Sequence, residues 1–402
     1  MHASPENFYK DSFDYEPRTR LVFGCEKIDQ IGDLAKELGG TRVLLVTDSG
    51  IVAAGHAQRV DDSLVAAGLL VVRFDDSREN PTTKCVDDCV AVAKAGDVDL
   101  IVGLGGGSSM DTAKGCNFIF TNGGRMKDYW GVGKATKPML PLIAIPTTAG
   151  TGSECQSFAL IADEITHAKM ACGDLKAAPK ISILDPSLTV SQPRRVTCCT
   201  GIDAIAHAVE TAVTKKRNRL STIFSKEGFR LCVESLPRVL ANPGDLDARG
   251  NMLLGAAYAG TAIENSMLGA AHSAANPMTA HFGTIHGQAV GLLLPHIVRF
   301  NAQDLESRKA YAELASVAGL ANLSDGLDQA VGALIARLET LLNLAEIPKT
   351  FVEAGGSADM IPLLAEEASK QWTANFNPRE VGVAEFVELY TATLIERGTG
   401  DA

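Results

Sequence analysis

The chain has 402 residues, of which 46% are hydrophobic and 21% charged, a composition typical of a folded protein and too apolar for a disordered one. Its length suggests two or three domains. Because the chain contains 37 Lys and Arg but 48 Asp and Glu, its formal net charge is −11, which provides no field to attract a nucleic acid backbone or an anionic membrane. We therefore expect neither nucleic acid nor a membrane as a partner.

The chain shows no sign of export. The first thirty residues lack the basic start and apolar core of a secretory signal. The most apolar segments, such as residues 140–145 and 289–294, are far shorter than the roughly 20 residues of a membrane helix. Nine cysteines, none in a CxxC pair, are typical of free thiols in a reducing compartment. We expect a cytoplasmic protein.

The first half of the chain alternates short apolar segments with segments of helical spacing. The apolar segments lack the alternation of half-buried strands, which predicts parallel strands buried on both faces. These predicted strands are residues 42–47, 69–74, 100–103, 140–145 and 181–184. Residues 51–67 and 84–95 have helical spacing. Residues 156–162 and 168–171, joined by a polar turn, predict a hairpin laid on the sheet.

The second half differs in character. From Pro193 onward, long Ala-, Leu- and Glu-rich segments separated by Gly and Pro predict helices only. We place the boundary near residue 190. The sequence therefore predicts an α/β domain with a parallel sheet over residues 1–190 and an all-α domain over residues 191–402.

A glycine turn follows the strand at residues 100–103. Gly105, Gly106, Gly107 and Ser108 lead into a predicted helix, and such a turn at a helix N-terminus is suited to binding a pyrophosphate. The turn nearly matches the dinucleotide-binding fingerprint, but the acidic residue expected about 20 residues downstream has no clear candidate. Taken alone, the turn leaves open a structural role or another phosphate ligand.

Two further segments follow predicted strands. Asp48 could accept hydrogen bonds from the ribose hydroxyls of a dinucleotide, which would favour NAD over NADP, or it could cap the helix that starts at Ile51. Residues 146–154 read Pro-Thr-Thr-Ala-Gly-Thr-Gly-Ser-Glu. Their hydroxyl and amide donors lie where open α/β sheets bind ligands, so we expect this loop to contact one.

The helical half contains candidate metal ligands. Asp203 and His207 are spaced i, i+4, which places them on one helix face. His272 and His286 each lie in glycine-marked, apolar surroundings. Individually, an Asp-His pair is more often a surface hydrogen bond and a single His more often a core residue. Together, one carboxylate and three imidazoles suit Fe²⁺ or Zn²⁺ and suit Ca²⁺ poorly.

With these motifs the chain resembles the iron-containing alcohol dehydrogenase family, whose signature segments occur here in order. They are residues 105–108 with Asp111 and Lys114, residues 146–151, residues 201–207 and residues 269–296. The resemblance implies a dehydroquinate-synthase-like fold, with an N-terminal NAD-binding domain and a C-terminal helical metal-binding domain. It also implies NAD and Fe²⁺, or Zn²⁺, as cofactors, and a homodimer or higher homo-oligomer.

The resemblance assigns roles to individual residues. The implied metal ligands are Asp203, His207, His272 and His286. The implied cofactor-binding residues are Asp48, Gly106, Gly107, Ser108, Asp111, Thr147, Thr148, Thr151 and Lys169. The chain departs from the family at Asn276, where a further histidine close to the nicotinamide is common. Since Asn cannot titrate, His281 is a candidate substitute in proton transfer, and a structural histidine is the alternative. Asn276 and His281 are the candidate catalytic or substrate-contacting residues.

The implied reaction is hydride transfer between a nicotinamide and a small primary alcohol, diol or aldehyde, with the metal as Lewis acid. One alternative is a metal- and NAD-dependent lyase of the dehydroquinate synthase type. Its phosphorylated, carboxylated substrate would require basic side chains, but residues 255–295 contain neither Lys nor Arg. The other alternative is a non-catalytic NAD-binding relative, which the departure at Asn276 suggests.

Overall fold

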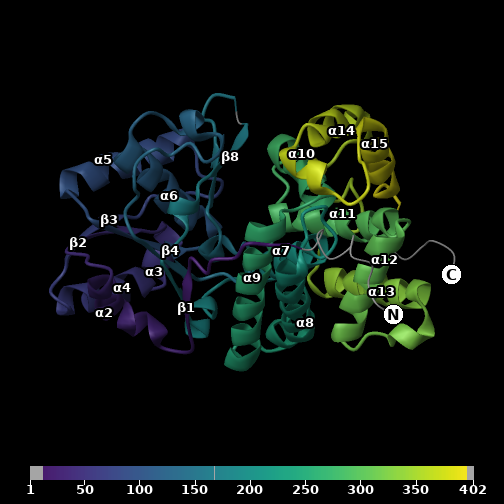
Figure 1. Cartoon of the computed structure of the whole chain (residues 1–402), viewed down its shortest axis with the longest axis horizontal. Helices are drawn as coiled ribbons and strands as arrows, with labels where there is room; N and C mark the ends of the chain where they lie inside the picture. Colours follow the sequence, from purple (N-terminus) through teal and green to yellow (C-terminus); the bar gives the residue numbers. More distant parts are fainter. Residues whose placement is uncertain (1–11, 167, 396–402) are drawn as a thin grey trace. The chain divides into compact units, whose positions relative to one another are not determined.

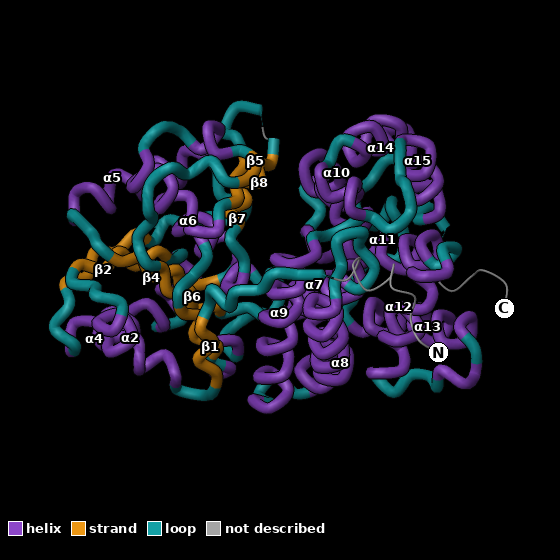
Figure 2. The backbone as a smooth tube through the Cα atoms, viewed as in Figure 1, coloured by secondary structure: helices purple, strands orange, loops and turns teal. Residues whose placement is uncertain are grey.

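The computed structural model describes residues 12–166 and 168–395. They divide into two compact units, one over Glu16–Gln192 and the other holding the residues from Pro193 onward together with those before Glu16. Every strand formed by the described residues belongs to the first unit, whereas the second contains helices and loops (Figure 2). Within the described residues, no helix has both the length and the apolar character needed to cross a membrane.

The first unit is built on a six-stranded sheet in the order β1-β9-β6-β4-β2-β3, in which every pairing is parallel. Its strands are β1 (Arg20–Phe23), β2 (Arg42–Val46), β3 (Leu70–Phe74), β4 (Leu100–Gly105), β6 (Leu142–Pro146) and β9 (Ile181–Leu184). The predicted parallel α/β architecture is confirmed. Strand β1 was not predicted, because it is a short edge strand whose side chains are largely exposed.

Helices cover both faces of this sheet (Figure 1). One face carries α2 (Ile31–Glu37), α3 (Ser49–Ala53) and α4 (His56–Ala66), and the other carries α5 (Thr83–Gly96) and α6 (Gly107–Asn122). Successive residues of β2 enter different cores: Val43 and Leu45 join the first, Leu44 and Val46 the second. Because both faces are buried, the strand is continuously apolar. The predicted helix at 51–67 is instead two helices, interrupted at Gly55, whose φ is +83°.

The predicted hairpin is present as β7 (Phe158–Ala162) and β8 (Lys169–Gly173), which pair antiparallel. It is not laid on the main sheet: with β5 (Gly131–Val132) it forms a separate sheet in the order β5-β8-β7, packed against α6. Short 3-10 helices complete the unit: η1 (Lys27–Gln30), η2 (Met126–Tyr129), η3 (Ser153–Cys155), η4 (Leu175–Ala177) and η5 (Pro186–Thr189).

The second unit is helical, as predicted. Its helices are α7 (Arg194–Thr211), α8 (Arg219–Ala241), α9 (Leu246–Ser266), α10 (Ala270–Phe282), α11 (His286–Asn301), α12 (Leu305–Val317), α13 (Leu327–Leu344), α14 (Ile361–Ser369) and α15 (Val383–Ala392), with η6 (Leu323–Asp325), η7 (Ala358–Met360) and η8 (Trp372–Phe376). Helix α7 packs against α8, α9 and α11. It is buried at every residue from 201 to 211, so polar side chains on it lie in the core of the unit.

Candidate metal centre and nucleotide site

The candidate metal centre is built on α7. Asp203, His207 and Glu210 are spaced i, i+4 and i+7, which places all three on one helix face, and all three are buried. Polar groups in such a position need partners, because an unpaired buried charge is costly. The partners come from α10 and α11.

The structure brings the four predicted metal ligands together. Three imidazole Nε2 atoms surround Asp203 Oδ1: that of His272 at 3.3 Å, that of His207 at 3.5 Å and that of His286 at 3.8 Å. The rings of His207 and His272 stack with centroids 4.7 Å apart, and the ring of His286 lies 5.3 Å from that of His272.

The cluster fits a metal ion. Candidate ligand atoms of Asp203, His207 and His272 all lie within 4.8 Å of one another. Asp203 Oδ1 and His272 Nε2 are buried, and neither makes a hydrogen bond with any part of the chain that the structure describes. Buried polar atoms are nearly always paired, and a cation among these atoms would satisfy both. His286 is the least buried of the four, with 28% of its side chain exposed.

A close helix contact positions His286. It is the first residue of α11, and Gly287 follows it. A Cβ at Gly287 would lie only 2.1 Å from the carbonyl oxygen of Cys199 on α7. Only glycine therefore lets the start of α11 approach α7 one turn before Asp203.

The charges of the cluster are strongly coupled. Burial disfavours ionisation of Asp203, but the neighbouring imidazoles outweigh it and hold the pKa of Asp203 well below its usual range. Burial likewise lowers the pKa of His272, but the carboxylates of Glu210 and Asp203 outweigh it and raise the pKa of His272 to about 9. The cluster thus holds an ionised carboxylate beside the basic imidazole of His272.

Glu210 is a site residue that the sequence analysis missed. Its Oε2 lies 2.5 Å from Nδ1 of His272, and its Oε1 accepts a hydrogen bond from the backbone N–H of Ala271 at 2.6 Å. The signal that could have found it is its spacing of seven residues from Asp203, which continues the face already identified on α7.

The two candidate substrate-contacting residues lie on α10. Asn276 follows His272 by one turn, and its side-chain amide donates a hydrogen bond to Gln371 Oε1 at 3.1 Å. His281 lies in the last turn of the helix, where its Nε2 is 2.9 Å from Glu367 Oε2. Gln371 and Glu367 are distant in the sequence, so local patterns could not have identified these pairs.

The candidate nucleotide site begins at the glycine turn. Strand β4 ends at Gly105, whose φ of +143° favours glycine, and Gly106 is the N-cap of α6. Gly107 and Ser108 form the first turn of α6, where backbone N–H groups lack partners within the helix and can bind an anion. The structure thus places all three predicted turn residues at one helix N-terminus.

The loop of residues 146–154, called the threonine loop below, packs against this turn. A Cβ at Gly107 would lie 2.8 Å from Cγ2 and 2.9 Å from Oγ1 of Thr151, so the contact requires glycine. Thr148 Oγ1 lies 3.6 Å from the Cβ position of Gly106 and is buried, with no hydrogen-bond partner among the described residues. It is therefore a donor available to a ligand. Thr147 is buried, and its Oγ1 accepts a hydrogen bond from Gln192 Nε2 at 3.1 Å.

Asp48 performs the capping role and also faces the glycine turn. Its Oδ1 accepts the N–H of Ile51 at 3.0 Å, which caps α3. Its Oδ2 accepts from Ser109 Oγ at 3.2 Å, and a Cβ at Gly105 would lie 3.1 Å from the same oxygen. The cap is thus real, and it leaves the second carboxylate oxygen at the predicted nucleotide turn.

Asp111 lies beneath the turn. It is buried, and its Oδ1 accepts a hydrogen bond from Ser153 Oγ at 2.8 Å. The buried ammonium of Lys114 donates to the carbonyl oxygen and the hydroxyl of Ser153 at 2.6 and 2.8 Å, and to the carbonyl oxygen of Phe158 at 3.0 Å. These bonds tie α6 to the threonine loop, so Asp111 holds that loop in place. Lys169 begins β8, and its charge acts on Asp111.

Glu154, next to Ser153 in η3, was also missed. Its side chain is fully enclosed, and burial raises the pKa of Glu154 to about 7. The sequence carries no signal for this, because the same Gly-Ser-Glu segment on a surface would leave the carboxyl group solvated.

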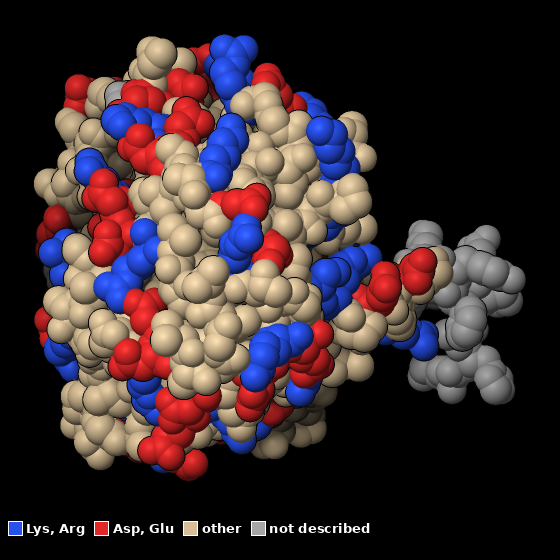
Figure 3. Space-filling model, turned by 90° about the vertical axis from the view of Figure 1, so that its left-hand side faces the viewer, with Lys and Arg blue, Asp and Glu red and all other residues tan. Residues whose placement is uncertain are grey.

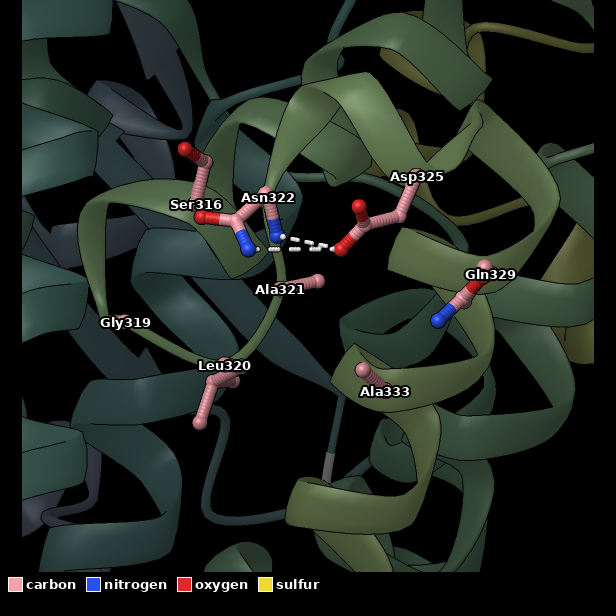
Figure 4. Close-up of a pocket in the computed structure, with 8 residues that line it drawn as sticks. All are labelled: Ser316, Gly319, Leu320, Ala321, Asn322, Asp325, Gln329 and Ala333. Atoms are coloured by element: carbon pink, nitrogen blue, oxygen red, sulfur yellow. Dashed lines mark hydrogen bonds between the residues drawn. The ribbon is translucent and has the colours of Figure 1, made fainter.

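A hollow elsewhere in the helical unit is a less suitable site. Figure 4 shows it between the end of α12 and the start of α13, lined by short polar and apolar side chains. Asp325 Oδ2 already accepts hydrogen bonds from the backbone and side-chain nitrogens of Asn322, at 3.3 and 3.4 Å. Its charged group is thus occupied by a neighbour, in contrast to the unpaired atoms of the metal centre.

Comparison with known proteins agrees with this geometry. Residues 17–186 match the family model described as iron-containing alcohol dehydrogenase, and residues 197–394 match the model for the C-terminal part of that family. The chain is 35% identical to an NAD-dependent methanol dehydrogenase from Bacillus methanolicus, over 92% of this chain and 96% of the relative. It is 32% identical to a 1,3-propanediol dehydrogenase from Klebsiella pneumoniae, over 94% and 98%.

The fold gives the same result. The solved structure of an alcohol dehydrogenase from Oenococcus oeni superposes with a TM-score of 0.91 at 30% identity, covering 95% of this chain and all of that one. The matches span both units of the structure and include each predicted signature segment. The chain therefore belongs to the iron-containing alcohol dehydrogenase family.

Proposed function

We propose that the protein is a metal-dependent dehydrogenase that interconverts a small primary alcohol or diol and the corresponding aldehyde, with NAD as hydride carrier. The observation that carries the proposal is the buried cluster of Asp203, His207 and His272, in which Asp203 Oδ1 and His272 Nε2 make no hydrogen bond among the described residues. We assign Fe²⁺, or Zn²⁺, to this cluster with His286 as the fourth ligand, because one carboxylate and three imidazoles suit both ions.

The metal, when bound, supplies Lewis acidity toward the substrate oxygen. The four side chains would hold the ion, and the burial of Asp203, His207 and His272 excludes water that would weaken its field. We assign the first turn of α6 and Thr148 to the dinucleotide pyrophosphate, and Asp48 to the ribose hydroxyls. Lys169 and Thr151 remain proposed cofactor contacts. Asp111 supports the threonine loop from beneath.

The substrate is proposed to be small and uncharged. Residues 255–295, which include two of the proposed ligands, contain neither Lys nor Arg. The amides of Asn276 and Gln371 carry no titratable proton, so we assign Asn276 to substrate contact rather than to proton transfer. His281 would act in proton transfer only if its bond to Glu367 opened. A lyase with a phosphorylated, carboxylated substrate is not favoured, because such a substrate would require basic groups and this segment has none.

Domain roles, assembly and location are also proposed. We propose residues 1–190 as the NAD-binding domain and residues 191–402 as the metal-binding domain. We further propose a homodimer, because β1 is an edge strand whose Leu21 and Phe23 are 36% and 44% exposed, an apolar edge that a second copy could cover. All nine cysteines are free thiols, which supports the reducing cytoplasm. Acidic and basic side chains are interspersed on the face shown in Figure 3, which supports a small-molecule partner rather than a polyanion.

The deciding experiment measures NADH formation by protein prepared without oxygen and loaded with Fe²⁺, using a panel of short primary alcohols and diols. The expected result is turnover that a chelator abolishes, and that His272→Ala abolishes together with bound metal. Full turnover by His272→Ala would remove that residue from the ligand set. Binding of NAD and metal without turnover on any alcohol would instead support a non-catalytic relative.

A further inference from the structure

Glu210 lies against a proposed metal ligand, so a role for it at the metal rests on the proposed metal-binding function. We propose that Glu210 is a positioning residue that fixes the tautomer of His272, so that its Nε2 presents a lone pair to the metal. The two oxygens of its side chain lie against the N–H of Ala271 and Nδ1 of His272, so it would act on the metal through His272.

The geometry of the pair is specific. Glu210 Oε2 and His272 Nδ1 are 2.5 Å apart, and their side chains are only 4% and 6% exposed. An ionised carboxylate accepts hydrogen bonds and cannot donate them, so the shared proton lies on Nδ1. The opposite ring nitrogen, Nε2, then faces Asp203 Oδ1 at 3.3 Å without a proton of its own when a metal is bound.

The second oxygen of Glu210 has a separate task. It accepts the N–H of Ala271, in the first turn of α10, where the N-cap residue Gly269 has no side chain to cap the helix. A carboxylate at this end also interacts favourably with the helix dipole. Glu210 therefore has two roles, capping α10 and orienting His272, and a test must separate them.

Glu210→Gln separates the two roles. If the Gln carbonyl oxygen accepts from Ala271, the cap is kept, but the amide then donates to His272 Nδ1 and forces its proton onto Nε2, where it blocks the metal. If the amide is flipped, its N–H₂ group points at the N–H of Ala271, so that two hydrogen-bond donors are in contact with no acceptor between them. Neither arrangement keeps both the cap and an unprotonated Nε2 on His272, so metal affinity should fall by about 10- to 100-fold, the usual effect of losing such an orienting partner.

The experiment titrates the metal-free full chain with Co²⁺ in competition with a chromophoric chelator, and records the visible spectrum of bound Co²⁺. Glu388→Gln, at an exposed position of α15 in the same unit, is the matched control. The expected result is unchanged affinity for the control, weaker binding with an altered spectrum for Glu210→Gln, and closely similar melting of the metal-free proteins. A merely structural cap would leave the Co²⁺ spectrum and affinity of Glu210→Gln unchanged.

Two outcomes distinguish the failures. If the wild type binds Co²⁺ and Glu210→Gln binds it equally well with the same spectrum, the role of Glu210 is refuted and the metal centre stands. If the wild type itself binds no Co²⁺, both proposals are refuted. Should Glu210→Gln fail to fold, nitrogen NMR of ¹⁵N-histidine in the Zn²⁺-loaded wild type decides: a protonated Nδ1 on His272 supports the proposal, and a protonated Nε2 overturns it.

Discussion

The buried carboxyl of Glu154 predicts a stability that decreases as the pH rises. In the folded chain, burial raises the pKa of Glu154 from 4.5 to about 7. Between these values the unfolded chain has released the proton and the folded chain still holds it. Stability from this group is therefore complete below pH 4.5 and lost progressively up to about pH 7. At about 1.4 kcal/mol for each pH unit, the full loss is about 3 kcal/mol.

Glu154→Gln removes this titration with little change in shape. We expect the free energy of unfolding of the variant, relative to the wild type, to increase by about 2 to 3 kcal/mol between pH 5 and pH 8. Urea unfolding of both metal-free proteins across that range measures it, and other titrating groups cancel in the comparison. Glu164→Gln, in the exposed turn between β7 and β8, is the matched control for removing a carboxyl group that is not buried. A pH-independent difference between Glu154→Gln and the wild type would refute the reasoning, because the carboxyl of Glu154 would then have an ordinary pKa.

Four further substitutions test the nucleotide site and its supports. Asp48→Asn keeps a cap acceptor and removes the charge, so kcat/KM for NADP relative to NAD should rise, and an unchanged ratio would leave Asp48 as a cap only. Gly107→Ala places a Cβ 2.8 Å from Thr151 and should cost about 1 to 3 kcal/mol of stability as well as NAD affinity, both measurable by urea unfolding and calorimetry. Gly106→Ala meets nothing closer than 3.6 Å and should lower NAD affinity alone; equal stability losses in the two variants would contradict the assignment. Lys114→Met leaves the buried acceptors on Ser153 and Phe158 without this donor and should cost about 3 to 5 kcal/mol of stability in the same unfolding assay. A loss below about 1 kcal/mol would show that the hydrogen bonds of Lys114 contribute little to stability.

The features of the fold that were predicted are those recorded in contiguous residues. Strand β2 is apolar without alternation because Val43 and Leu44 face different cores, and that pattern is visible in the sequence alone. Strand β1 has no such pattern, since its outer edge and most of its side chains are exposed. Strand β5 has only two residues and exists because β8 lies beside it, a consequence of tertiary packing.

The same distinction applies to the site. The spacing of Asp203 and His207 within α7 was visible, because residues one turn apart on a helix are neighbours whatever the tertiary structure. The bond between Glu210 and His272 joins residues 62 positions apart, and the partner of Asn276 lies 95 positions away. Such pairs depend on how α10 packs on its neighbours, which a single sequence does not record. The capping role of Asp48 was likewise open until the structure showed that its Oδ1 accepts from Ile51, while its Oδ2 accepts from Ser109 beside the glycine turn.

The buried polar side chains of the proposed metal centre destabilise the helical unit unless they have partners, and this cost explains which of their atoms the protein pairs. Helix α7 places Asp203 and Glu210 in the core, where an unpaired carboxylate is costly. Glu210 is compensated fully by Ala271 and His272, whereas Asp203 Oδ1 and His272 Nε2 are left without hydrogen-bond partners, at about 1 to 3 kcal/mol each. The carboxylate of Glu210 is thus satisfied by the protein, whereas these two atoms of the proposed metal centre are not. A metal bound to these atoms only in the folded chain would add its binding energy directly to stability, so the deficit left by folding would become part of the affinity for the ion.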